Sequence, residues 1–230
     1  MILFWTLFGT TGLAFLGWRF WLPLRNPERQ PPPGDGFLSP ADGYVVYVRR
    51  VERGQIPIAI KQRREIPLEE LAACPSLQGA SGWLMGVYMT AFSVHHNRVP
   101  LSGEVLEIQR VNAGKNRTMA RLSTRLLSGR QPYAEDCDYL IENDRVTMVV
   151  ATGGSYYALT QIADKWISYI INTCVPGQWL ERGAQYGLIR FGSQVDVFLP
   201  DGLGYRPVAR EGTYVYAGET ILAEKTQYEP

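Results

Sequence analysis

The sequence predicts a mainly β protein with some α+β character, preceded by an N-terminal transmembrane helix. Runs rich in β-branched and aromatic residues recur along the chain, for example Tyr44–Val48 and Gln194–Leu199. Glycine and proline residues typical of turns separate these runs. The chain opens with Met1–Trp18, a segment without charged side chains. In a helix this segment would be about 27 Å long, which is close to the hydrocarbon thickness of a bilayer.

Composition places few limits on function but excludes some classes. The chain has 230 residues, with 23 Lys and Arg against 22 Asp and Glu, so we expect no nucleic-acid partner. The cysteines Cys74, Cys137 and Cys174 are far apart and form no CxxC motif. This spacing predicts neither a disulfide framework nor a metal site, and it favours reduced thiols in the cytosol.

Residues 1–23 are predicted to form a membrane anchor at the cell membrane. A cleaved signal peptide would need a basic start and a small-residue cleavage site, and neither is evident. Arg19, Arg25 and Arg29 lie at or after the end of the apolar stretch, whereas only the α-amino group precedes it. The positive-inside rule therefore predicts that the rest of the chain faces the cytoplasm. Whether the anchor spans the bilayer or lies peripherally in it stays open.

After the anchor, residues 24–36 are predicted to be a Pro/Gly-rich linker, because Gln30–Gly36 cannot form a helix. Residues 37–230 are expected to form one domain built mainly of strands. Its predicted elements are strands at Tyr44–Val48, Trp83–Val94, Glu104–Val111 and Tyr156–Ile162, a strand pair over Tyr139–Val150 that turns at Asn143 and Asp144, a short helix within Ile66–Cys74, and a short helix or strand within Trp166–Thr173.

The stretch Asn112–Asp138 has the character of a loop and carries a basic cluster. A solvated face is the ordinary interpretation of such a cluster, and contact with anionic lipid near the anchor is the alternative. The cations are Lys115, Arg117, Arg121, Arg125 and Arg130.

The C-terminal part contains an internal repeat. The segments Gly177–Gly183 and Gly212–Gly218 each place two glycines six positions apart, flank a short hydrophobic strand and precede another strand. The pattern resembles the paired turns of biotinyl/lipoyl-like (hammerhead) barrel-sandwich domains. No lysine turn motif accompanies it, so no swinging-arm lysine is expected.

The most unusual position is the Gly192–Ser193 junction, between β-runs at Leu188–Phe191 and Gln194–Leu199. A glycine inside a β-pattern usually marks a bulge or a bend. Here it also leaves a carbonyl unshielded beside a serine hydroxyl. Ser193 Oγ can attack the carbonyl carbon of Gly192 if the bond is strained and a base is near. The alternative is an ordinary bulge whose serine bonds to its own backbone.

His95 and His96 are the two histidines of the chain. Neighbours on a strand point to opposite faces, so at most one of them can face a given site. Histidine suits proton transfer near neutral pH, although a surface or core role is the common alternative. Asp42 stands beside a glycine at the entrance of a strand, where a turn role is also common.

Taken together, these motifs resemble the phosphatidylserine decarboxylase family in its short, archaeal-type branch. The match runs from about Leu24 to Ala223 and rests on the order and spacing of its parts. The matching motifs are Leu24–Arg29, Ser39–Gly43, Phe92–Arg98, Glu142–Arg145, Tyr157–Ile162, Gly187–Val197 and Gly218–Ala223.

The resemblance implies a self-cleaving enzyme that uses a covalent pyruvoyl group derived from Ser193. Cleavage between Gly192 and Ser193 would give a β chain of residues 1–192 and an α chain of residues 193–230. The implied reaction converts phosphatidylserine in the membrane to phosphatidylethanolamine with release of CO2, as a step of phospholipid biosynthesis. The pyruvoyl group acts as the electron sink. Homo-oligomerisation stays open.

The resemblance also assigns roles near the histidines. His95 matches the first histidine of the long-chain branch and is the expected proton donor, and His96 is a bystander. Arg98 occupies the position of that branch's second histidine, so the relay of the long-chain enzymes does not carry over. Asp42 is expected to orient or charge-stabilise a histidine. Two other readings stay open: a non-enzymatic membrane-anchored adaptor, and a hydrolase that uses Ser193, His95 and Asp42.

Overall fold

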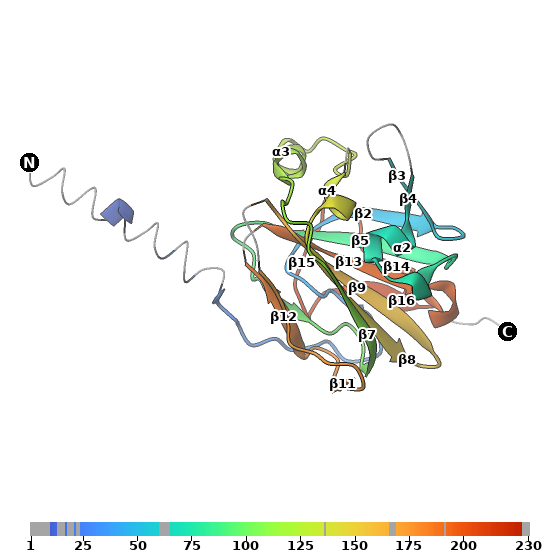
Figure 1. The fold of residues 1–230 in the computed structure, drawn as a ribbon. Helices are drawn as coiled ribbons and strands as arrows, with labels where there is room; N and C mark the ends of the chain where they lie inside the picture. Colours follow the sequence, from blue (N-terminus) through green and yellow to red (C-terminus); the bar gives the residue numbers. More distant parts are fainter. Residues whose placement is uncertain are drawn as a thin grey trace, which may run out of the picture.

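The computed structural model describes residues 10–12, 17, 21, 24–59, 65–135, 137–165, 169–190 and 192–226. The predicted mainly β character is confirmed, because an eight-stranded antiparallel sheet dominates this part of the chain (Figure 1). In spatial order its strands are β11 (Trp179–Leu180), β7 (Gly103–Val111), β8 (Arg145–Thr152), β9 (Ser155–Ala163), β13 (Ser193–Pro200), β5 (Gly82–Met89), β2 (Gly43–Val51) and β15 (Tyr214–Val215).

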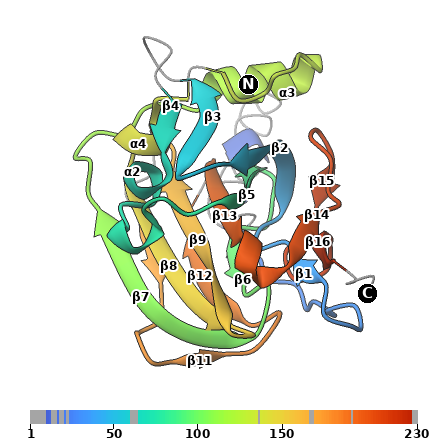
Figure 2. The same cartoon turned by 90° about the vertical axis from the view of Figure 1, so that its right-hand side faces the viewer.

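Smaller sheets complete the β-structure. The large sheet curls, as the strongly bent β7 shows in Figure 2. Two three-stranded sheets and a hairpin accompany it. They are β10 (Ile170–Asn172) with β12 (Gln185–Ile189) and β6 (His96–Arg98); β1 (Phe37–Leu38) with β16 (Ile221–Lys225) and β14 (Tyr205–Pro207); and β3 (Gln55–Ala59) with β4 (Glu65–Pro67).

The period-2 alternation of strand residues divides the core into two layers. On β13, Val195 and Val197 join a cluster that also contains Tyr186 of β12 and Leu222 of β16. This first layer therefore lies between the large sheet and the two three-stranded sheets. Phe198 faces the other way, into a second cluster with residues of β3, β4 and the short helices. Both faces of β13 are therefore buried, and strands β9 and β5 flank it on either side in the sheet.

The two glycine-flanked segments of the repeat, Gly177–Gly183 and Gly212–Gly218, have matching backbone conformations and matching places in the sheets. All four of its glycines have positive φ, between 74° and 84°, a conformation that glycine adopts without steric cost. In each half, a two-residue strand (β11 or β15) lies at an outer edge of the large sheet, and a five-residue strand (β12 or β16) continues into a three-stranded sheet. The two halves thus close opposite sides of the fold in the same way.

Two predictions about helices were wrong, and one was confirmed. The predicted loop over Asn112–Asp138 contains α3 (Ala120–Ser128), and the first arm of the predicted strand pair at Tyr139 is α4 (Tyr139–Glu142). In α3, Leu122 and Leu126 stand four residues apart and pack on the second cluster. The frequent arginines obscure this helical spacing. The helix predicted within Ile66–Cys74 is α2 (Leu68–Ala72), and the short 3-10 turns are η4 (Pro75–Leu77) and η5 (Asp201–Leu203).

The predicted anchor over residues 1–23 falls almost entirely outside the described residues, as do positions 166–168 of the predicted element Trp166–Thr173. Within the described part of the chain, no helix has both the length and the apolar character needed to cross a membrane. β10 occupies Ile170–Asn172 in the remainder of that predicted element.

Candidate active site

Ser193 begins β13 in the middle of the large sheet. It is fully buried, and it lies opposite Met89 of β5 and Ala163 of β9. Its Oγ forms no hydrogen bond with any of the residues that the structure describes. A buried hydroxyl without a partner is costly, and such cost is commonly retained at functional sites. The alternative of an ordinary bulge, in which the serine hydroxyl bonds its own backbone, therefore does not describe Ser193.

The junction before Ser193 is a crossing between sheets. β12 ends at Ile189 in a three-stranded sheet, whereas β13 begins at Ser193 in the eight-stranded sheet. Phe191 lies outside the described residues, so the path is described only to 190 and again from Gly192. Between Ile189 and Ser193 the chain thus passes from the three-stranded sheet to the eight-stranded sheet.

Asp164 faces Gly192 and was not foreseen from the sequence. A Cβ added at Gly192 would lie 3.0 Å from Asp164 Oδ2. The other oxygen, Oδ1, accepts the backbone N–H groups of Met119 (2.8 Å) and Lys165 (2.6 Å). Burial raises the pKa of Asp164, while these backbone bonds oppose the shift. Only the pairing of β9 with β13 reveals this proximity, and an Ala-Asp-Lys sequence carries no signal for it.

His95 is fully buried and lies between β5 and β6. Its carbonyl accepts the N–H of Ile189 (3.3 Å), close to where β12 leads towards Gly192. The segment 90–95 starts after Met89, the cross-strand partner of Ser193. The fold therefore brings His95 and Ser193 to the same end of the sheet.

Burial lowers the pKa of His95 to about 4. A backbone hydrogen bond with Ser93 opposes this shift, whereas the nearby Arg25 and His96 act in the same direction as burial. The ring is consequently neutral near pH 7 and able to accept a proton. His96 is partly exposed, and its Nε2 donates to the carbonyl of Leu24 (3.2 Å). The two histidines thus have different surroundings, as neighbours on a strand should.

Asp42 is buried at the start of β2, and groups other than His95 engage both of its carboxylate oxygens. Oδ2 lies 2.8 Å from Arg29 Nη2, and Oδ1 accepts the N–H of Ala217 (2.7 Å). Burial raises the pKa of Asp42, and these two partners oppose that shift. Arg29 also pairs with Glu219 at 2.7 Å.

The segment predicted as a linker is packed against the domain from Leu24 onward. Arg98, at the position of the missing second histidine, donates through Nη2 to the side chain of Asn26 (2.8 Å) and to the carbonyl of Pro27 (3.1 Å). Arg182 donates to the carbonyls of Pro32 and Gly36. Residues 24–36 are therefore bound to the domain by side-chain hydrogen bonds, which the sequence pattern did not predict.

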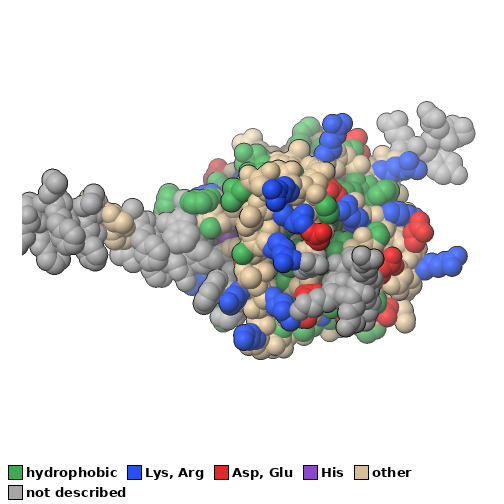
Figure 3. Space-filling model, turned by 90° about the horizontal axis from the view of Figure 1, so that it is seen from above, with side chains coloured by type: hydrophobic (Ala, Val, Ile, Leu, Met, Phe, Trp, Pro, Cys, Tyr) green, Lys and Arg blue, Asp and Glu red, His purple; other side chains and the backbone are tan. Residues whose placement is uncertain are grey.

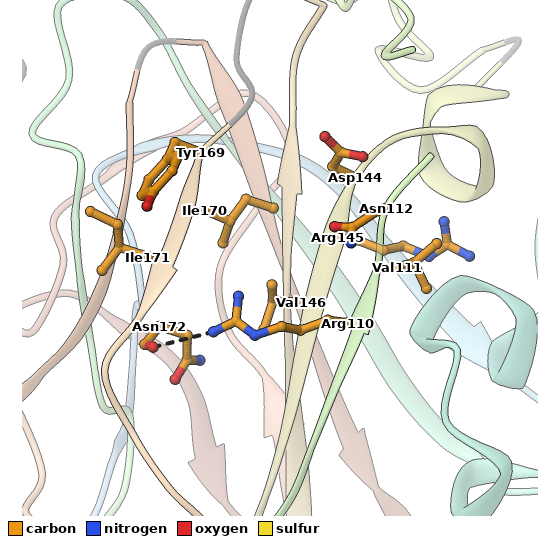
Figure 4. Close-up of a pocket in the computed structure, with 10 residues that line it drawn as sticks. All are labelled: Arg110, Val111, Asn112, Asp144, Arg145, Val146, Tyr169, Ile170, Ile171 and Asn172. Atoms are coloured by element: carbon orange, nitrogen blue, oxygen red, sulfur yellow. Dashed lines mark hydrogen bonds between the residues drawn. The ribbon is translucent and has the colours of Figure 1, made fainter. Parts of the chain in front are cut away.

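Two cavities lie on different sides of this region. One, of about 380 Å³, lies between the ends of β7 and β8 and strand β10, and Figure 4 shows Arg110 donating to the carbonyl of Asn172 (3.3 Å) inside it. The described residues lining it include neither Ser193 nor His95. The other, of about 500 Å³, is walled partly by Thr90, Ala91 and Phe92, which lead to His95. Figure 3 shows hydrophobic side chains (green) grouped at the left of the domain, with Lys and Arg side chains (blue) nearby.

The chain is similar to known proteins over nearly its whole length. A family model described as phosphatidylserine decarboxylase matches residues 16–223. A phosphatidylserine decarboxylase proenzyme of Nitratidesulfovibrio vulgaris is 36% identical over 205 residues, which are 88% of this chain and 76% of the relative. The proenzyme of Pelobacter propionicus is 33% identical, covering 86% and 73% of the two chains. That of Burkholderia ambifaria is 33% identical over 226 residues, covering 94% and 86%.

Proposed function

The chain belongs to the phosphatidylserine decarboxylase family, and from this premise we propose that it is a carboxy-lyase that converts phosphatidylserine to phosphatidylethanolamine and CO2. The observation that best supports this is the buried Ser193, whose Oγ has no hydrogen-bond partner among the described residues and which directly follows Gly192. A non-enzymatic adaptor would have no need for such a group. A Ser-His-Asp hydrolase is disfavoured because Arg29 and Ala217 engage the carboxylate of Asp42.

We propose that the chain cuts itself between Gly192 and Ser193. Ser193 Oγ attacks the carbonyl carbon of Gly192, and the amide becomes an ester as the amine of Ser193 is released. Removal of the Cα proton of Ser193 then breaks its Cβ–Oγ bond, and residues 1–192 leave with a terminal carboxylate. The remaining dehydroalanine takes up water and loses ammonia, which leaves a pyruvoyl group at position 193. Glycine at 192 suits the first step because a Cβ there would press on Asp164.

The residues around position 193 suit that group. When formed, the pyruvoyl group supplies the electron sink that accepts the electron pair left by departing CO2. Ser193 starts a strand buried on both faces, so water is excluded around it. The neutral ring of His95 at the same end of the sheet is the proposed proton carrier. A bound substrate carboxylate would raise the pKa of His95 again, which favours loading of the proton it then delivers.

Asp42 is a proposed positioning residue. Its bonds join Arg29 of the N-terminal segment to the backbone of Ala217, which would belong to the α chain after cleavage. Its proposed effect on His95 is through charge and through the fixed position of these neighbours.

The substrate is a membrane lipid, and this agrees with the anchor proposed at residues 1–23 and a cytoplasmic domain at the cell membrane. Such an anchor would raise the frequency with which the site meets its lipid. Leu24 bonds His96 and Arg25 bonds Phe92, so an anchor that ended at residue 23 would lead directly to the proposed site.

Intact-mass analysis of the purified protein tests the self-cleavage. We expect two chains, residues 1–192 and 193–230, the second with a pyruvoyl group in place of serine and reactive towards hydroxylamine. An uncut chain with a normal Ser193 would overturn the proposal. Labelling of Ser193 by a fluorophosphonate would instead support a hydrolase.

A further inference from the structure

The groove beside the segment 90–95 has an apolar lining and a fixed shape. Its walls include the rings of Tyr44, Tyr88, Phe92 and Tyr214 and the leucines Leu126 and Leu127 of α3. Tyr44 and Tyr214 pack edge to face with ring centres 5.0 Å apart. The Tyr214 hydroxyl donates to Ser93 Oγ (3.2 Å), and the hydroxyls of Tyr88 and Ser123 are hydrogen-bonded. The hydroxyls of Tyr88 and Tyr214 are thus hydrogen-bonded, and the ring carbons of these tyrosines line the groove.

The rim of the groove exposes large apolar side chains. Leu127 is 90% exposed and Phe92 is 67% exposed. Exposed residues of this size that border a preformed groove mark a site for an apolar ligand. The volume of about 500 Å³ suits a hydrocarbon chain.

Arg25 interacts both with a residue of this groove and with His95. Its Nη2 donates to the carbonyl of Phe92 (2.6 Å), so it is fixed at the groove wall. Its positive charge also acts on three neighbouring groups. It adds to the lowering of the His95 pKa by burial, and it opposes the rise that burial causes in the pKa values of Asp42 and Tyr214. The residues on either side are tied down, since Leu24 bonds His96 and Asn26 bonds Gln185. A guanidinium held in this way presents a planar set of donors that matches a phosphate.

A diacyl phospholipid with a serine headgroup has the same order of parts. The amine and carboxylate that react come first, the phosphodiester follows within a few bonds, and the acyl chains come last. The protein offers Ser193 and His95, then the Arg25 cation, then the apolar groove. We propose that Arg25 binds the phosphodiester of the lipid and that one acyl chain of the same molecule lies in the groove walled by Phe92, Tyr214 and Leu127. This assignment rests on the proposed function, and it names the parts of the molecule that select a lipid.

The test compares two variants on two ligands. The ligands are long-chain phosphatidylserine in mixed micelles and glycerophosphoserine, which keeps the phosphodiester but has no acyl chain. Glycerophosphoserine is measured both as a substrate and as a competitor of the lipid. Arg25→Gln should lower kcat/KM for the lipid, and weaken the action or competition of glycerophosphoserine, by about 10- to 100-fold, because a charge-assisted bond is lost. The Phe92→Ser/Leu127→Ser double variant should show a kcat/KM for the lipid that is about 10-fold lower, with the action of glycerophosphoserine unchanged.

Two substitutions elsewhere in the chain serve as matched controls. Arg110→Gln, in the distant cavity of Figure 4, and Leu106→Ser, a 52% exposed leucine of β7, should behave as wild type. All variants should still be cut at Ser193. The subsite is overturned if Arg25→Gln matches wild type, if the double variant weakens both ligands equally, or if glycerophosphoserine neither reacts nor competes. A wild-type protein that is neither cut nor active would refute the proposed function instead.

Discussion

Replacing Gly192 by alanine tests the steric basis of the proposed cleavage. The new methyl group would lie 3.0 Å from Asp164 Oδ2, whereas ordinary contacts of this kind are at 3.4 Å or more. Asp164 cannot swing away freely, because two backbone N–H groups hold its Oδ1. Overpacking of this kind costs about 1 to 2 kcal/mol. If that cost falls on the approach of the Gly192 carbonyl to Ser193 Oγ, self-cleavage should slow about 5- to 30-fold.

The assay follows the appearance of the chain 193–230 by mass spectrometry, starting from freshly translated precursor. The matched control is Gly202→Ala, whose methyl would meet Ser155 Oγ at an ordinary 3.4 Å, and it should cut at the wild-type rate. Asp164→Ala in combination with Gly192→Ala should restore most of the lost rate, since the pair is coupled through one contact. The steric argument is refuted if Gly192→Ala cuts at the wild-type rate, or if the double variant is as slow as the single one.

Four further outcomes are expected from the same structure. Ser193→Ala should remain a full-length, inactive precursor on a denaturing gel, and any cutting of it would remove Ser193 from its role. His95→Asn should lower decarboxylation at least 100-fold in a CO2-release assay, and a near-normal rate would show that another group moves the proton. The folded-state pKa of His95, about 4, lies below the unfolded value near 6.5. The unfolded chain therefore binds a proton at this residue more readily than the folded chain does. His95 leaves the free energy of unfolding unchanged above pH 6.5 and lowers it by up to about 3 kcal/mol as the pH falls to 4. Thermal unfolding of His95→Asn should therefore be less sensitive to acid than that of wild type, and equal acid sensitivity would contradict the buried neutral ring. Asp42→Asn removes the charge from a buried ion pair with Arg29 and should lower the midpoint of thermal unfolding by several degrees. The control Arg50→Gln breaks an exposed ion pair and should change this midpoint little. Equal effects of the two substitutions would contradict the burial of the Asp42–Arg29 pair.

Strands were predictable where local rules decide the backbone. β2, β7 and β9 coincide closely with their predicted runs, because alternating and β-branched residues suit a pleated sheet buried on one or both faces. The turns at the four glycines of the repeat were predictable because only glycine adopts positive φ without strain. α3 and α4 were missed because short helices owe their stability to packing.

For the candidate site, the sequence singled out only the two groups that we propose to react. Ser193 and His95 stand out by residue type and by their neighbours in the sequence. Asp164 beside Gly192, and Arg29 beside Asp42, depend on contacts made in space. Strand register and the return of residues 24–29 onto the domain decide these contacts, and no pattern within a single sequence encodes them. The segment predicted as a spacer therefore contributes side-chain contacts with the domain, such as that of Arg29 with Asp42.

The most direct test of the account is the chemistry at position 193 in the mature protein. Sequencing of the C-terminal chain by tandem mass spectrometry should find residues 193–230 beginning with a ketone-bearing group that borohydride reduces and that has no free amine. A mature chain still continuous through positions 192 and 193, with an unmodified serine and with lipid decarboxylation nonetheless measured, would contradict it.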